Sequence, residues 1–272
     1  MPIGEVYASL ETKRPALLNV FFPAAMMAIF NNMLFGIGEV FHSNVWWSRV
    51  FAMREDVGPR AYVLAGLLWF PIPIVAGFLG LAAPALGINV TRPDVVGPVV
   101  AASVLGYSGA LLVFIVVFCS LASSIDSLLA ATGDVVTKEI VQPFFMPDAN
   151  DERLRKVAAV VIVSVGLTTW AICLPKIGTL ATVLFFAGSL VGSTIWPILA
   201  GLYWRRMSGT GAVLAMVLGS AAGLVAYFQI GWYTASLIGT GVSFLITVTA
   251  ARFVPATFNW RALRPSIQEL TT

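Results

Sequence analysis

The chain has 272 residues, of which 58% are hydrophobic and 11% are charged, and its net charge is +3. A soluble core of this length cannot bury about 158 apolar side chains, which excludes a globular cytosolic protein. Dividing that number by the about 20 to 23 residues of a membrane span predicts about seven spans. Basic residues on so apolar a chain are typical of cytoplasmic loops, so we expect a lipid bilayer and no nucleic acid as partner.

Seven apolar runs, bounded by charged residues, proline or glycine, follow one another along the chain. Each is long enough to cross a bilayer as a helix, and none shows the alternation of a barrel strand. The predicted fold class is therefore an all-α membrane protein with a single transmembrane domain over residues 1–272. The predicted spans are residues 17–41, 61–86, 107–131, 155–174, 178–203, 211–229 and 232–251.

The first span contains two glycines and two ionisable residues close together. Gly36 and Gly38 bracket a midspan position, and Glu39 and His42 follow. This pattern predicts a helix that breaks at the glycines, because irregular backbone at membrane depth survives where it lines a polar cavity. All four residues are therefore candidates for a solute cavity. The alternative is a pair of packing glycines with a contact between Glu39 and His42.

The third span carries a polar stripe. Ser120, Ser123, Ser124 and Ser127 have the spacing that places side chains on one helix face. Hydroxyl and carbonyl oxygens can replace part of the water shell of an alkali cation. The stripe indicates either a cation site or serines that bond to the carbonyl one turn back. Asp126 beside it would complete a cation site, pair with a basic group, carry a proton or make a structural hydrogen bond, and Asp126 and Ser127 are further cavity candidates.

Two long connections between predicted spans and two pairs of glycines four positions apart are expected to have structural roles. Residues 87–106 are predicted to form an external segment, and residues 132–154 a solvated cytoplasmic linker. The small-residue spacings at 188–192 and 219–223 are typical of close helix packing in membranes.

The basic residues predict the orientation. The larger group is Arg49, Arg54, Arg60, Lys138, Arg153, Arg155, Lys156, Arg205, Arg206, Arg252, Arg261 and Arg264. The smaller group, on the other side, is Lys13, Arg14, Arg92 and Lys176. Because positive loops stay inside, the larger group and the C-terminus are expected in the cytoplasm, with the protein in the plasma (inner) membrane. With seven spans the N-terminus is then expected outside, which suggests helices upstream.

The most specific pattern begins at the serine stripe. Residues 123–129 read Ser-Ser-Ile-Asp-Ser-Leu-Leu and lead without a gap to Thr-Lys-Glu-Ile at 137–140. This stretch resembles the signature helix of the sodium:solute symporter family, which runs S-T-A-D-S-Q-L-L and closes with T-E-D-I-Y. The exit of the first span at 47–52 is similar to that family's W-Q-R-x-x-A. The prolines at 71–73 and the small residues at 192–197 fit in the same order.

The resemblance implies the leucine-transporter architecture, with two inverted five-helix repeats and a sodium site between them. It implies that Ser123 and Ser124 supply hydroxyl ligands and that Ser120 supplies a backbone carbonyl. The other sodium ligands lie on a first core helix that has no counterpart here. We therefore expect the seven spans to be the second repeat plus two helices, a partial symporter that needs a missing N-terminal half in order to transport.

The predicted function is sodium-coupled symport of a small polar organic solute by alternating access. The G-x-V-F spacing at 38–41 is closest to the urea branch of the family, whereas D-S-L-L at 126–129 is closer to the proline and pantothenate branches, so the solute stays open. Ser48, Leu128 and the pair at 138–139 depart from the family pattern. The alternative is a membrane sensor module with the same fold. One histidine and no metal-ligand cluster argue against an enzyme, and no cofactor beyond the coupling ion is expected.

Overall fold

The computed structural model describes residues 3–175, 178–254 and 256. Within these ranges the chain forms helices and turns and no strand. The predicted all-α membrane class and the predicted seven spans are confirmed, whereas the inverted repeat stays a prediction. The segments long and apolar enough to cross a membrane are Pro23–His42, Gly58–Ala85, Pro93–Phe145, Asp151–Cys173, Leu180–Tyr203, Gly209–Gln229 and Trp232–Phe253.

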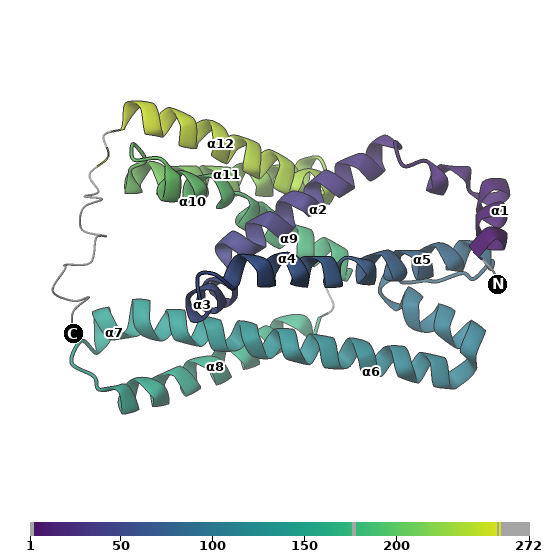
Figure 1. Ribbon diagram of the computed structural model, residues 1–272, viewed down its shortest axis with the longest axis horizontal. Coiled ribbons are helices and arrows are strands. Elements are labelled where there is room, and N and C mark those ends of the chain that lie inside the picture. The colour runs from purple at the N-terminus through teal and green to yellow at the C-terminus, as the bar shows by residue number, and fades with distance from the viewer. Residues whose placement is uncertain (1–2, 176–177, 255, 257–272) are drawn as a thin grey trace. The chain divides into compact units, whose positions relative to one another are not determined.

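The helices gather into two compact units. Unit 1 comprises Met1–Val20 and Ser43–Thr179, and unit 2 comprises Phe21–His42 and Leu180–Thr272. Unit 1 contains α1 (Ile3–Lys13), α3 (Asn44–Ala52), α4 (Gly58–Trp69), α5 (Pro71–Ala85), α6 (Val96–Val135), α7 (Gln142–Phe145) and α8 (Asp151–Cys173). Unit 2 contains α2 (Pro23–His42), α9 (Leu180–Gly192), α10 (Ile195–Tyr203), α11 (Gly209–Gln229) and α12 (Ala235–Phe253), as labelled in Figure 1.

Helix α1, which no pattern in the sequence predicted, packs on the end of α5. Leu10 of α1 is buried. The Ser9 hydroxyl and the Lys13 ammonium group donate to the carbonyl oxygen of Ala85, at 2.9 and 3.3 Å. The last carbonyls of a helix have no partner within the helix, so these bonds satisfy the C-terminus of α5 and fix α1 to it.

The third span is a much longer helix than expected. It begins at Val96, bends at Gly106, whose φ of 69° favours glycine, and continues through a π-helical turn at Val136–Val141 into α7 (Figure 1). The predicted external segment at 87–106 is therefore helical from Val96 onward, and the predicted linker at 132–154 is helical over most of its length. Charged residues marked the linker in the sequence, but they are compatible with a helix that continues into water.

Within unit 1, α8 lies beside α6 (Figure 1). A side chain on Gly133 of α6 would lie 2.5 Å from Ile162 Cγ1, so the glycine permits the close approach. The N-terminus of α8 is capped by Asn150, whose side-chain oxygen accepts from the Arg153 amide at 3.0 Å. The predicted cytoplasmic linker is thereby reduced to a short turn.

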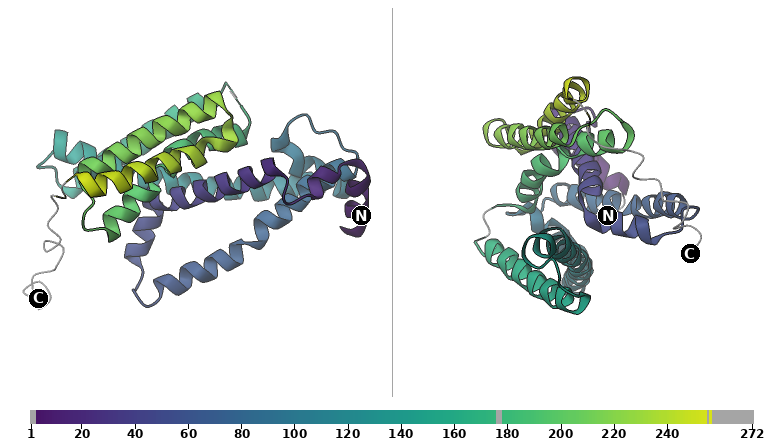
Figure 2. Two further views of the ribbon diagram at one scale, coloured as in Figure 1. Left: turned by 90° about the horizontal axis from the view of Figure 1, so that it is seen from above. Right: turned by 90° about the vertical axis from the view of Figure 1, so that its left-hand side faces the viewer.

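In unit 2, α11 and α12 form an antiparallel pair through small residues. Every buried residue of α11 is glycine or alanine, and the two helices run side by side in both Figure 1 and Figure 2. A Cβ atom on Gly219 would lie 2.9 Å from the carbonyl oxygen of Gly239, and one on Gly223 would lie 2.9 Å from that of Ala235. The predicted packing role of Gly219 and Gly223 is confirmed.

Helix α9 packs into the same unit by the same means. A Cβ atom on Gly188 would lie 2.5 Å from the Ser236 hydroxyl oxygen, and one on Gly192 would lie 2.8 Å from that of Thr240. Both hydroxyls belong to α12, so the predicted packing role of Gly188 and Gly192 is also confirmed. The hydroxyl of Ser243 donates to the carbonyl oxygen of Ser193 at 2.5 Å and adds a polar link across this interface.

Candidate functional site

The first span does not break at its glycines. Helix α2 runs without interruption through Gly36 and Gly38 to His42, and the chain leaves the helix at Ser43, which has extended φ and ψ angles of −83° and 121°. The predicted break at Gly36 and Gly38 is therefore wrong. A Cβ atom on Gly38 would lie 2.5 Å from the carbonyl oxygen of Val191, so this glycine serves packing, whereas Gly36 meets no atom within 4 Å.

The two ionisable candidates of α2 lie in its last turn. Glu39 is half-buried, and His42 is exposed at the final residue of the helix. The structure places both beside the break at Ser43 rather than after a break at the glycines. Their role in a solute cavity stays a prediction.

The serine stripe lies on one face of α6 in unit 1, as its spacing predicts. The hydroxyl of Ser120 donates to the carbonyl oxygen of Val116 at 2.9 Å, that of Ser124 to Ser120 at 3.0 Å, and that of Ser127 to Ser123 at 3.1 Å. Three of the four serines thus make the bond that the structural interpretation requires. That bond is compatible with a cation site, because a hydroxyl that donates its hydrogen keeps oxygen lone pairs.

The candidate ligands differ in how much of their bonding capacity is free. The Ser120 carbonyl accepts the Ser124 hydroxyl and also the helical amide of residue 124, so both of its lone pairs are in use. It becomes a cation ligand only if the Ser124 hydroxyl turns away. The hydroxyl of Ser123 makes no hydrogen bond in the part of the chain that the structure describes, which makes it the most available oxygen of the stripe.

Sequence reasoning missed the approach of Arg49 to this stripe. Its guanidinium group lies 3.5 Å from the Ser127 hydroxyl oxygen and 5.4 Å from the centre of the Trp46 ring. Arg49 and Ser127 are 78 positions apart, so no local pattern could have paired them. Asp126 is exposed on the same helix and has no ion pair within the described ranges. At the Ser127 end of the stripe, the Arg49 guanidinium group therefore lies close in space, and the Asp126 carboxylate is next to Ser127 in the chain.

These features define a polytopic helical membrane protein with a line of hydroxyl groups inside one span. The model of the sodium:solute symporter family matches residues 61–219, which is more than half of the chain and includes the serine stripe. The chain belongs to the sodium:solute symporter family, and the resemblance seen in its motifs is confirmed.

Several curated relatives are similar to this chain. The urea-proton symporter DUR3 of Oryza sativa subsp. japonica is 28% identical over 207 residues, 73% of this chain and 29% of that protein. The osmoregulated proline transporter OpuE of Bacillus subtilis (strain 168) is 26% identical over 252 residues, 88% of this chain and 49% of that protein. The high-affinity proline transporter PutP of the same strain is 21% identical over 277 residues, 94% and 57% respectively.

The matched regions therefore span 29% to 57% of the lengths of these relatives. The family and the relatives are transporters, which agrees with the prediction that this chain is not an enzyme. No solved structure matches the chain significantly.

Proposed function

We propose that this chain forms part of a symporter that couples the movement of a small polar organic solute, such as urea or proline, to the movement of sodium. The observation that carries the proposal is the hydroxyl stripe of α6, which lies within residues 61–219 matched by the family. The names of the relatives supply the two solutes. The relatives support solute transport, and each of them is a longer protein that this chain matches only in part.

Sodium is proposed as the coupling ion because of the chemistry of the stripe. Two hydroxyls and one carbonyl are hard oxygen ligands, and they suit an alkali cation better than they suit a proton, which needs a titratable acceptor. Ser123 and Ser124 would contribute hydroxyls, and Ser120 its carbonyl once the Ser124 hydroxyl has turned. An alkali cation takes about five or six oxygens, so other segments must supply the remainder.

Replacing both Ser123 and Ser124 by alanine is expected to weaken sodium coupling. Loss of one charge-assisted oxygen contact costs about 1.5 kcal/mol, so the sodium concentration for half-maximal uptake should rise at least about tenfold. Uptake of labelled urea and proline is measured against sodium concentration in cells that express the full reading frame containing this chain.

The matched control is Ser108→Ala, which removes an exposed hydroxyl from the same helix outside the stripe. It should leave the sodium dependence unchanged. One relative is named a urea-proton symporter, so uptake is also followed against pH. Uptake by the double variant that keeps its sodium dependence, or uptake by the wild type that follows pH and ignores sodium, would rule out the assignment of sodium to this stripe.

The proposed orientation has the C-terminus in the cytoplasm and the protein in the plasma (inner) membrane. Within unit 1, Lys13 and Arg14 line one cavity together with Asn89, which supports their assignment to one side. Lys176, Arg261 and Arg264 lie outside the described residues.

Cysteine labelling is expected to place Asn89 outside and Asp148 inside. Both residues are exposed, and they precede and follow the membrane-crossing part of α6. Asp148 is chosen because a cysteine at Asn150 would remove the cap of α8. In a background without Cys119 and Cys173, an impermeant maleimide should label Asn89→Cys in intact cells, and Asp148→Cys only after permeabilisation. Labelling of both positions in intact cells, or the reverse order, would overturn the orientation.

A further inference from the structure

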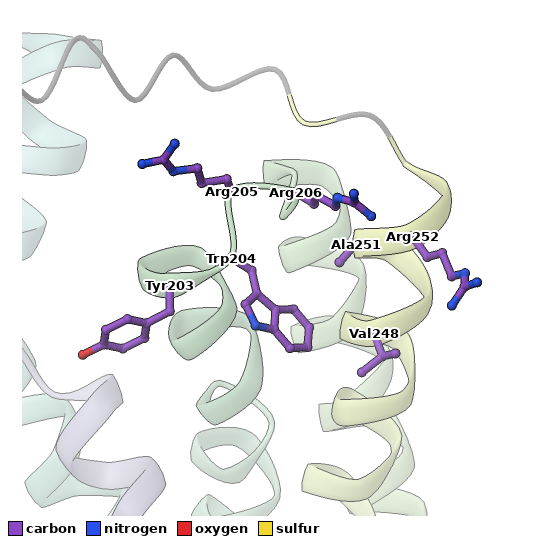
Figure 3. A pocket seen from close by; sticks show the side chains of 7 residues that line it. All are labelled: Tyr203, Trp204, Arg205, Arg206, Val248, Ala251 and Arg252. Carbon is purple, nitrogen blue, oxygen red and sulfur yellow. The ribbon is translucent and has the colours of Figure 1, made fainter.

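Unit 2 contains a cavity of about 470 Å³ where α10 ends and α12 ends, with basic and aromatic side chains around it (Figure 3). Its lining includes Trp204, Arg205 and Arg206 from the turn after α10, and Arg252 from the last turn of α12. In Figure 3 the indole of Trp204 points toward α12, and Arg206 extends toward the end of that helix. The transport proposal uses none of these residues.

The turn that carries the two adjacent arginines is held in place by its neighbours. The Met207 amide donates to the carbonyl oxygen of Trp204 at 3.0 Å, and the buried Ser208 hydroxyl caps α11 by accepting from the Gly211 amide at 3.1 Å. A Cβ atom on Gly211 would lie 2.7 Å from that of Ala250, so the start of α11 is packed on the end of α12. The positions of the turn and of the last turn of α12 are therefore fixed relative to each other.

The charge of the cavity is uncompensated among the described residues. Arg205, Arg206 and Arg252 are exposed, and within residues 3–175, 178–254 and 256 none of them forms an ion pair. In Figure 3 the side chains of Arg205 and Arg252 extend away from each other, as like charges do, and an anion in the cavity would attract both. Guanidinium groups also match the paired oxygens of a phosphate better than ammonium groups do.

The depth of the cavity fits the headgroup layer of a bilayer. The segment Trp232–Phe253 is about 33 Å long as a helix, close to the hydrocarbon thickness of about 30 Å, so its last turn ends at the membrane surface. Tyr203 and Trp204 lie at the same end, and such aromatic side chains are typical of that interface. The arginines therefore lie at the level of lipid phosphates.

We propose that this cavity binds the phosphate of an anionic phospholipid, with the guanidinium groups on the phosphate and Trp204 against the glycerol and upper acyl region. The site is independent of the solute and of the coupling ion. A free phosphate ion shares the headgroup chemistry but would gain nothing from the apolar lining supplied by Val248 and Ala251.

The test uses the purified chain in phosphatidylcholine nanodiscs that also contain phosphatidylglycerol, with the bound lipid counted by native mass spectrometry. The variant Arg205→Gln, Arg206→Gln, Arg252→Gln should bind phosphatidylglycerol about a hundredfold more weakly, since each basic residue at an anionic surface contributes about fivefold. The triple lysine variant at the same positions should bind less tightly than the wild type but more tightly than the triple glutamine variant, because it keeps the charge and loses the paired hydrogen bonds. Should the triple glutamine variant not fold, Arg206→Gln and Arg252→Gln alone should each show about a fivefold loss.

The matched control is Arg60→Gln, Arg153→Gln, Arg155→Gln, which removes the same charge from exposed positions of unit 1. It should lose far less binding than the triple glutamine variant of the cavity, because its three arginines do not line that cavity, and inorganic phosphate should not displace the lipid. Unchanged binding by the triple glutamine variant, an equal loss in the control, or displacement by inorganic phosphate would each overturn the proposal. The last of these results would identify a site for the phosphate ion.

Discussion

Replacement of Gly219 by valine is expected to separate α11 from α12 and to destabilise unit 2 by about 3 kcal/mol. A Cβ atom at this position would lie 2.8 Å from Ser243 Cβ, 2.9 Å from the carbonyl oxygen of Gly239 and 3.0 Å from Ser193 Cβ. One of these atoms is backbone and the other two are the first atoms of short side chains, so none can rotate away. The helices must move apart, and they then lose the close contact that holds them together in lipid.

The loss is measured as the free energy of unfolding of the purified chain in a titration with sodium dodecyl sulfate, followed by circular dichroism. The control is Gly241→Val, because Gly241 is an exposed residue of α12 that has no atom within 4 Å of an added Cβ. It should change stability by less than about 0.5 kcal/mol. Similar stabilities for the two valine variants would contradict the packing of α11 on α12 at Gly219.

The number of spans and the packing glycines could be predicted because both depend on local patterns. A run of apolar residues long enough to cross a bilayer has few other structures open to it, and small residues at every fourth position let two helix backbones approach. Gly188, Gly192, Gly219 and Gly223 therefore lie against other helices as expected.

The course of the first span could not be predicted, because the glycines of α2 fit two structures equally well. What decides between them is the atom opposite Gly38, the carbonyl oxygen of Val191, and it lies far away in the sequence. The true end of the helix at Ser43 has no glycine or proline to mark it. For a similar reason α1 was missed, since Leu10 is buried only because α1 packs on α5.

The candidate site was predicted in part. The helical period places Ser120, Ser123 and Ser124 on one face correctly, but it does not show which oxygens are already bonded. The structure distinguishes them, since the Ser124 hydroxyl donates to the Ser120 carbonyl oxygen while the Ser123 hydroxyl has no such bond within the described residues.

No pattern in the sequence separates Asn31 from its neighbour Asn32, although only the first of them is buried.

Asn31 of α2 acts as the N-terminal cap of a helix more than two hundred positions away. It is completely buried, and its side-chain oxygen accepts from the backbone amide of Ser236 at 2.9 Å. Ser236 is the second residue of α12, so its amide has no partner within the helix. The neighbouring Thr234 does not cap the helix, because its hydroxyl donates to the carbonyl oxygen of Gly231 instead. Asn31 therefore joins α2 to α12 within unit 2.

Replacement of Asn31 by alanine is expected to cost about 2 to 3 kcal/mol of unfolding free energy, because a buried amide loses its acceptor and a small cavity opens. Hydrogen exchange of the peptide that contains Ser236 should quicken in the same variant. Asn32→Ala is the control, since Asn32 is exposed one position along the same helix and should leave both measurements near the wild-type values. Wild-type exchange around Ser236 in the Asn31 variant would mean that α12 does not depend on this cap, whatever the change in stability.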